Sequence, residues 1–434
     1  MNTLKRELTF WDLVANGMIF IGPASIIGIF GVLYAKSGGA VGLVYIIATV
    51  MMSFTALSYV EMSAVVPKAG SIFSYASESF GKNIGFFSGW MLLLDYFFIP
   101  AVAYLFSGIA FHALITSISA WIFTLLAVGI TLTFNLFGAK KVSLFNRVVL
   151  FGICIVLAVI IIEGLIIVFQ GNSISPVAHS FYMPKQMSSH AIFSAVSIAV
   201  LSFLGFDAIA TYAEEQKNGK NHIKKAMIFC LVFSGILFII ESVIGCALAM
   251  HSASYYQIHP ELQGTLYYDI VKDYYSNWVF IVLSLFKAFG AACSAMVATS
   301  ASSRLLYSIS RNGLLNSSLS KTSEKHGTPV VAIISTTCVT MIIAVVAACF
   351  SNGLDILSSM VNIGALVAFF MLHLSVIKYF KKENRNVLRH RVIPVLGAII
   401  ICYVIYQSSH LAQLLACLWL ITGVMFMLVS KKYG

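Results

Sequence analysis

The sequence predicts an all-α membrane protein with twelve transmembrane helices, on the strength of its composition and its apolar runs. Of the 434 residues, 59% are apolar and only 10% are charged, and the mean hydropathy is +0.93. A soluble domain carries about 25% charged residues, so this chain has too little polar surface to cover a soluble fold. Twelve spans of about 20 residues each would use roughly 240 residues, which leaves short connections.

Each apolar run that is long enough for a helix is interpreted as one span. A short polar leader, residues 1–12, precedes the first span. Several runs exceed the length of a perpendicular span, so these helices are expected to tilt or to extend into water. In chain order the predicted spans are 12–34, 39–64, 84–111, 120–138, 143–169, 189–213, 225–249, 274–307, 329–350, 355–379, 392–408 and 410–430.

The basic residues predict that both termini are cytoplasmic. With the amino terminus inside, all but four of the 27 Lys and Arg residues fall on the cytoplasmic side. The exceptions are Lys36, Lys185 and Lys272 outside and Lys287 within the eighth span. Short loops rich in Lys and Arg stay in the cytoplasm. The same placement leaves no solvated basic domain, so nucleic acid is not expected as a partner.

Two spans, the first and the sixth, are interrupted in the middle. Pro23 removes a backbone donor and clashes with the preceding turn, and the glycines around it weaken the helix. Gly205 interrupts the sixth span in the same way. Each interruption is either a kink in a packed helix or an unwound segment whose free N–H and C=O groups line a substrate cavity. The candidate residues at the two breaks are Gly22, Pro23, Ala24, Ser25, Gly28, Phe203, Gly205, Phe206 and Asp207.

The spacing of the two breaks predicts the domain organisation. They lie five helices apart, which is typical of a transporter built from two inverted repeats. Because five is an odd number, the two halves would have opposite topology. The predicted units are a first repeat at 1–170, a second repeat at 171–380, and helices eleven and twelve at 381–434.

Ionisable residues inside the predicted spans are functional candidates, because each costs free energy to bury. Asp207 follows the sixth-span break directly, so its carboxylate and the free backbone would together attract a cation or an ammonium group. Asp95 and Tyr96 lie well inside the third span, ahead of Pro100. These residues form the predicted substrate site together with the two breaks.

The remaining intramembrane charges have several possible roles. Lys287, far from either end of its span, would pair with a carboxylate, bind a substrate carboxylate or carry a transported proton. Glu61, near the cytoplasmic end of the second span, would act as a gate or pair with loop cations. Glu163 and Glu241 lie among bulky aliphatic residues and stay unassigned.

The sequence lacks the usual motifs of metal sites and hydrolases. The eight cysteines fall inside apolar runs without a Cys-x-x-Cys pair, so they are expected to be small buried side chains. Neither His-Glu-x-x-His nor Gly-x-Ser-x-Gly occurs. We therefore expect no enzyme, no metal site and no cofactor.

Motifs spread over the whole chain carry a family resemblance. They are 66–71 with Tyr75, 205–208, 214–218, 223–226, 303–307, 311–312 and 327–329. Together they resemble the amino acid/polyamine/organocation permease superfamily. The resemblance implies its LeuT-like fold, a five-plus-five inverted repeat with helices 1 and 6 broken, which works by alternating access. It also implies ion-gradient-driven import, usually with protons, across the bacterial cytoplasmic (inner) membrane.

The resemblance also implies roles for single residues. Tyr96 and Asp207 would face the substrate, and Asp95 would meet a cationic amine. Lys287, Asp207 and Glu61 are the candidates for proton coupling. The small-molecule substrate and the lipid bilayer are the expected partners, and the oligomeric state is left open.

The substrate stays open between an amino acid and a small amine. Residues 93–96, 203–207 and 362–369 are similar to the putrescine importers of bacteria. However, Gly28 stands where those importers have an acidic residue, and Lys287 suits a carboxylate better than a dication. An exchanger of amino acids or amines is the alternative, followed by a non-transporting sensor on the same fold.

Overall fold

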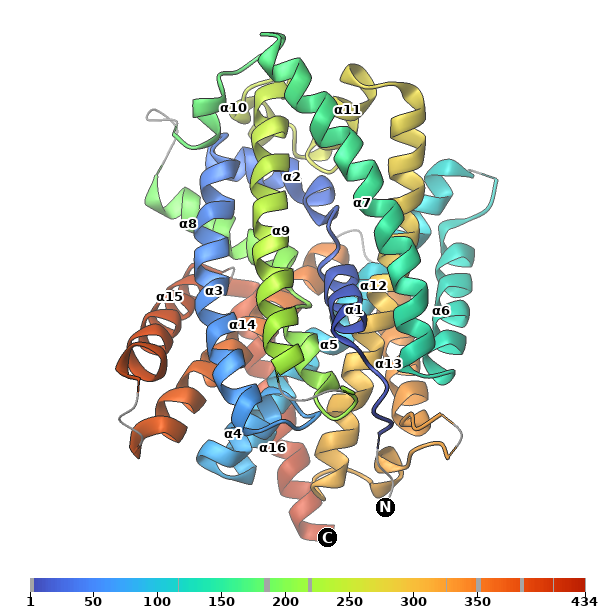
Figure 1. Ribbon diagram of the computed structural model, residues 1–434, viewed down its shortest axis with the longest axis vertical. Coiled ribbons are helices and arrows are strands. Elements are labelled where there is room, and N and C mark those ends of the chain that lie inside the picture. Colours follow the sequence, from blue (N-terminus) through green and yellow to red (C-terminus); the bar gives the residue numbers. More distant parts are fainter. Residues whose placement is uncertain are drawn as a thin grey trace.

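The chain forms a bundle of long helices, and both termini lie at the same end of it (Figure 1). The computed structural model describes residues 4–115, 117–182, 188–217, 221–324, 326–348, 353–382, 386–408 and 410–433. Eleven helices among them are long and apolar enough to cross a membrane, and Ala120–Leu136 is a shorter apolar helix. The predicted all-α membrane fold is therefore confirmed.

Sixteen helical pieces make up the spans in the described residues, because the first and sixth spans are interrupted and a short helical turn, η7, precedes α15. In chain order they are α1 (Phe10–Ile21), α2 (Ser25–Ser37), α3 (Val41–Val65), α5 (Lys82–Leu114), α6 (Ala120–Leu136), α7 (Ala139–Phe169), α8 (Ser189–Ala199), η2 (Val200–Phe203), η3 (Asp207–Tyr212), α9 (Asn221–Leu248), α12 (Asn277–Arg311), α13 (Val330–Ala348), α14 (Gly353–Tyr379), η7 (Leu388–Val392), α15 (Ile393–Gln407) and α16 (His410–Tyr433).

Each predicted span contains observed helix, but the ends differ. The first span begins at Phe10, and α5 runs from Lys82 to Leu114 straight through Pro100. The eighth begins at Asn277 instead of 274, because the residues before it close a separate helix. Long helices extend beyond the hydrocarbon core into the loops. Hydropathy alone does not predict where such extensions end.

Short helices occupy connections that the sequence analysis treated as loops. They are α4 (Ile72–Phe80), α10 (Ala253–Ile258) and α11 (Leu266–Tyr274), with the single turns η1 (Val177–Ser180), η4 (Pro260–Leu262), η5 (Ser317–Ser320) and η6 (Phe380–Lys382). The α10 helix starts where the Ser252 hydroxyl accepts a bond from the Tyr255 N–H. Both α10 and α11 lie at the end of the bundle opposite the termini (Figure 1).

The expectation that the cysteines are buried is wrong for three of them. Cys338, Cys402 and Cys417 are exposed on the outside of the bundle. In a bilayer the lipid-facing surface is as apolar as the core, so an apolar run does not tell which way a side chain faces.

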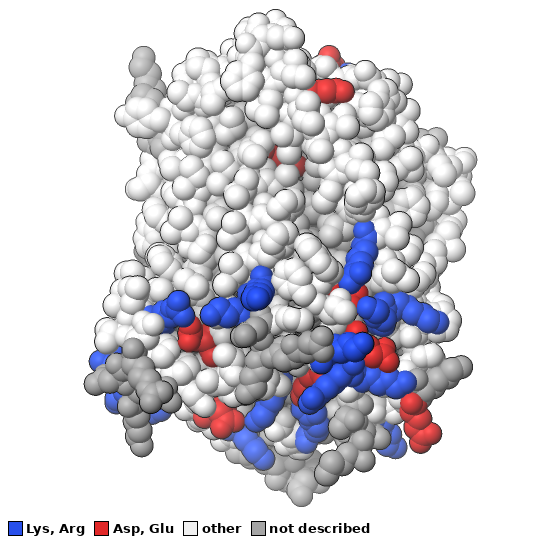
Figure 2. All heavy atoms as spheres, viewed as in Figure 1, with Lys and Arg blue, Asp and Glu red and all other residues white. Residues whose placement is uncertain are grey.

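Basic side chains gather towards one end of the molecule. Figure 2 shows most of the visible Lys and Arg side chains in the half that contains both termini in Figure 1. Four residues used for the orientation prediction, Lys185, Lys220, Lys325 and Arg385, lie outside the described residues. The cytoplasmic location of the termini stays a prediction.

Candidate functional site

The first span is broken between α1 and α2. The N–H of Gly22 donates to the Met18 carbonyl at 2.9 Å and closes α1, and Gly22 then turns the chain with a φ of +70°. Pro23 has no N–H with which to continue the helix. The new helix starts at Ser25, whose N–H donates to the Gly22 carbonyl at 2.8 Å. The break is thus an unwound segment, not a kink.

The sixth span is broken at the predicted place. Regular α-helix ends at Ala199, a tight 3-10 turn follows, and the chain is then turned by Gly205, whose φ is +123°. Asp207 begins the next 3-10 segment, and its Oδ1 accepts a bond from the Gly205 N–H at 3.0 Å. The carboxylate therefore binds the backbone that the break has freed.

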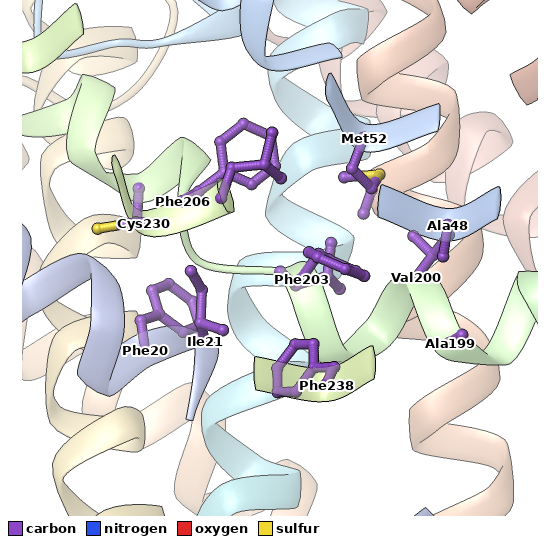
Figure 3. Close-up of a cluster of buried hydrophobic side chains, with 14 of the residues drawn as sticks. Phe20, Ile21, Ala48, Met52, Ala199, Val200, Phe203, Phe206, Cys230 and Phe238 are labelled. Atoms are coloured by element: carbon purple, nitrogen blue, oxygen red, sulfur yellow. The ribbon is translucent and has the colours of Figure 1, made fainter. Parts of the chain in front are cut away.

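The two breaks touch each other. A Cβ atom at Gly205 would lie 2.7 Å from the ring of Phe20 and 2.8 Å from the backbone nitrogen of Ile21, the last residues of α1. Figure 3 shows these two residues beside the buried rings of Phe203 and Phe206. Only glycine fits at this crossing, both for its φ and for its lack of a side chain.

Asp207 and Tyr96 form the centre of the candidate site. The Tyr96 hydroxyl donates to Asp207 Oδ2 at 2.7 Å, and both residues are buried. The Ser302 hydroxyl donates to the Tyr96 carbonyl at 2.5 Å, which ties α5 to α12 beside the site. The structure thus brings together two residues that the sequence predicted, and it adds Ser302, which sequence reasoning missed.

Asp95 places a second carboxylate next to this centre. It is buried, its Oδ1 has no hydrogen-bond partner within the described chain, and it interacts electrostatically with Asp207. Neither carboxylate takes part in any ion pair between described residues. Two buried carboxylates are costly to keep ionised without a counter-charge. The site therefore favours a bound proton or a cationic group.

Lys287 bridges α12 to the first-span break. Its Nζ donates to the Ala24 carbonyl at 2.7 Å, so the ammonium binds the residue directly before α2, whose carbonyl also accepts a 3.3 Å bond from the Ile27 N–H. A Cβ atom at Gly28 would lie 3.3 Å from this Nζ, so the small residue leaves room for the ammonium. Ser294, one of the residues that sequence reasoning missed, makes a similar bond from α12 to the Phe20 carbonyl at 3.0 Å.

Glu61 has partners of another kind. Its carboxylate lies 3.3 Å from His390 Nε2 and 3.6 Å from an Arg389 nitrogen, both in η7. This matches the sequence-based alternative in which Glu61 pairs with cations of a loop. Its described partners include no residue of either break.

A buried ion pair closes the end of the bundle that contains the termini. The Arg304 guanidinium donates to both carboxylate oxygens of Glu215 and lies over the Tyr212 ring, 4.3 Å from the ring centroid. Arg304 and Glu215 are almost fully buried. The sequence analysis used them as motif residues and missed the pair. The available signal was an arginine in an apolar helix facing two consecutive glutamates in a connection.

The adjacent Glu214 forms a more exposed pair with Arg311. An Arg311 nitrogen donates to the Glu214 carboxylate at 2.8 Å, and the Ala69 N–H donates to it at 3.1 Å. Partial burial acts to raise the pKa of Glu214, but these two donors and the charge of Lys68 outweigh it and lower the pKa below its ordinary value. The carboxylate thus stays ionised and joins three segments of the chain.

An all-helical membrane bundle whose two broken spans meet beside buried charges is the architecture of a membrane carrier. Comparison with known proteins gives the family. The profile described as "Amino acid permease" matches residues 8–430. The chain therefore belongs to the amino acid permease family. Its relatives in this family are transporters and not enzymes.

Three relatives illustrate the range of the family. The low-affinity putrescine importer PlaP of Escherichia coli K12 is 28% identical over 99% of this chain and 94% of its own length. The branched-chain amino acid permease BcaP of Bacillus subtilis is 27% identical over 100% of this chain and 94% of its own. The mitochondrial cationic amino acid transporter 3 of Arabidopsis thaliana is 25% identical over 86% of this chain and 62% of its own.

Proposed function

We propose that the protein imports an amine or an amino acid across the bacterial cytoplasmic membrane by proton symport. The observation that carries this proposal is the pair of buried carboxylates, Asp95 and Asp207, without a cationic partner among the described residues. An ammonium group is common to amines and amino acids, and it would supply the missing positive charge. The names of the bacterial relatives are consistent with both substrate classes.

In the proposed cycle the substrate enters from outside and its ammonium binds Asp207, which Tyr96 and the Gly205 N–H hold in place. The backbone of the two breaks, at 22–25 and around Gly205, contacts the rest of the substrate. The inverted repeats, 1–170 and 171–380, then move against each other and open the site to the cytoplasm, where both termini lie. The inward proton gradient drives the cycle, and Lys287, Asp207 and Glu61 are the groups considered for coupling.

Uptake into proteoliposomes tests the proposal. The purified chain is reconstituted, an inward proton gradient is imposed, and labelled putrescine is compared with a pool of labelled amino acids. We expect accumulation of one class, which disappears when an ionophore removes the gradient. Uptake that requires internal substrate and ignores the gradient would replace symport by exchange.

The substrate class that accumulates also assigns the charges. Accumulation of putrescine would assign Asp95 and Asp207 to an amine-binding site. Accumulation of amino acids would instead make Lys287 a candidate partner for the substrate carboxylate. Absence of uptake with proton gradients, sodium gradients and counterflow alike would contradict the proposal.

A further inference from the structure

One buried carboxylate is used by neither the substrate site nor the cytoplasmic ion pairs. Glu241, in α9, is fully buried, and neither of its carboxylate oxygens has a hydrogen-bond partner in the described structure. An ionised carboxylate taken out of water costs on the order of several kcal/mol, even after the protein relaxes. Glu241 is therefore either protonated or stabilised by a charge at longer range.

That longer-range charge is Lys287. It attracts the Glu241 carboxylate electrostatically, although the two side chains form no ion pair among those described. The Lys287 ammonium donates instead to the Ala24 carbonyl at 2.7 Å. The Lys287 ammonium thus has two interactions: a short hydrogen bond to the first-span break, and a longer-range attraction to Glu241 through the apolar interior.

Among the described residues, two tyrosines also interact electrostatically with Glu241. Tyr45 of α3 and Tyr267 of α11 lie within electrostatic range of its carboxylate. The Tyr45 hydroxyl is paired with Ser202 at 2.9 Å, and the Tyr267 hydroxyl donates to the backbone carbonyl of Glu241 at 3.4 Å. Neither hydroxyl donates to the carboxylate, so Lys287 is the group that responds to its charge.

Glu241 is also close to the half of the first span that follows the break. One helical turn further along α9, a Cβ atom at Gly245 would lie 2.7 Å from the ring of Phe30 in α2. Because α9 packs against α2 and Lys287 of α12 binds the residue directly before α2, a change of charge on Glu241 acts on the segment that begins at the break. Asp207 differs, since its carboxylate already accepts two hydrogen bonds.

We propose that Glu241 takes up the transported proton and that Lys287 is the fixed positive charge that responds to it. This rests on the proposed proton symport. An O–H bond forms on the Glu241 carboxylate when a proton enters, and the attraction to Lys287 disappears. The Lys287 ammonium then has the Ala24 carbonyl as its remaining partner, which changes the forces on the break. The O–H bond breaks when the proton leaves on the inside, and the attraction returns.

The test compares Glu241→Gln with Glu163→Gln in the full chain. Glu163 is a matched control, because it is also a single carboxylate in a membrane helix, α7, and is only partly buried. The probe is labelled putrescine or labelled leucine, whichever the unmodified protein accumulates. Two readouts are used in proteoliposomes: accumulation driven by a proton gradient, and counterflow exchange without a gradient.

We expect Glu241→Gln to lose gradient-driven accumulation at least tenfold and to keep counterflow exchange, while Glu163→Gln keeps both. A Glu241→Gln protein that accumulates normally overturns the inference. Loss of both activities in a folded protein also overturns it, because Glu241 would then serve structure or binding.

A second variant covers the case in which Glu241→Gln does not fold. Glu241→Asp keeps the acid and moves it, so the external pH for half-maximal accumulation should shift by at least half a unit. An unchanged pH profile contradicts the inference. Failure of the unmodified protein to accumulate either putrescine or any amino acid of the labelled pool under a proton gradient contradicts proton symport itself, and the two failures are thus distinguishable.

Discussion

Single residues define the candidate site through charges that lack a full set of partners. Asp207 accepts bonds from the Tyr96 hydroxyl and the Gly205 N–H, while the Oδ1 of the neighbouring Asp95 accepts none from the described chain. Natural proteins rarely leave a buried polar atom unpaired, and such an atom calls for an explanation. In the proposed function, a substrate ammonium bound at this place accounts for both carboxylates.

Asp207→Asn is expected to abolish uptake while the protein stays folded and inserted. The amide keeps the size of the side chain but removes the negative charge that an ammonium needs. The measurement is initial uptake in proteoliposomes, with gel-filtration profiles to check folding. Asp273→Asn, at an exposed position in α11, serves as the control, and near-normal transport by Asp207→Asn would remove Asp207 from the site.

Tyr96→Phe is expected to raise the substrate concentration for half-maximal uptake roughly tenfold or more, because a hydrogen bond to a charged group contributes about 1.5–3 kcal/mol. Tyr104→Phe is the matched control on the same helix, since its hydroxyl pairs with Thr131 at 2.7 Å away from Asp207. Concentration-dependent uptake measures both variants. Equal changes in the two would mean that the Tyr96 hydroxyl only supports packing.

At the scale of helices, the breaks are produced by backbone chemistry and fixed by contact with each other. Gly22 and Gly205 turn the chain with positive φ values, and Pro23 removes one helical bond. The end of α1 then packs against Gly205. The interrupted backbone segments of both spans therefore lie together in the interior of the bundle.

Gly205→Ala is expected to destabilise the protein by roughly 2 kcal/mol or more, because the new methyl group adds backbone strain and a clash at the contact with α1. Gly129→Ala, in α6, has no atom within 4 Å of the new Cβ and should be neutral or slightly stabilising. Thermal unfolding in detergent compares the two. An unchanged midpoint for Gly205→Ala would contradict the described crossing of the two breaks.

At the scale of the whole molecule, Asp95 and Asp207 are buried, and hydrogen bonds and an ion pair join chain segments at the end that contains the termini. The N–H of Leu8 donates to the Glu215 carbonyl at 3.0 Å, and the N–H of Lys217 donates to the Leu8 carbonyl at 2.9 Å. Together with the Arg304–Glu215 pair, these bonds tie the amino-terminal segment, the connection after the sixth span and α12. Opening this end of the bundle therefore requires these three segments to separate.

Arg304→Met is expected to cost about 3–5 kcal/mol, because it leaves the Glu215 charge buried without a partner. Arg311→Met should cost less than about 1 kcal/mol, because its pair with Glu214 is partly exposed. Thermal unfolding ranks the two variants. Adding Glu215→Gln to Arg304→Met should restore part of the loss, and equal effects of the two single variants would contradict the assigned burial.

Much of the fold could be predicted because its causes are local in the sequence. A run of about 20 apolar residues is long enough to span a bilayer wherever it occurs, and Pro23 and Gly205 interrupt a helix whatever surrounds them. The permease motifs are local in the same sense, and the family match over residues 8–430 agrees with them. The membrane class, the twelve spans and both breaks follow from these causes.

The pairing of the charges was decided by the tertiary structure alone. Lys287 and Ala24 are 263 residues apart, and Arg304 and Glu215 are 89 apart. Nothing local in the sequence tells which intramembrane charges meet, because helix faces that contact lipid and helix faces that contact protein are equally apolar. For the same reason Glu241 looked like one acid among aliphatic residues, and only the tertiary structure brought it within electrostatic range of Lys287.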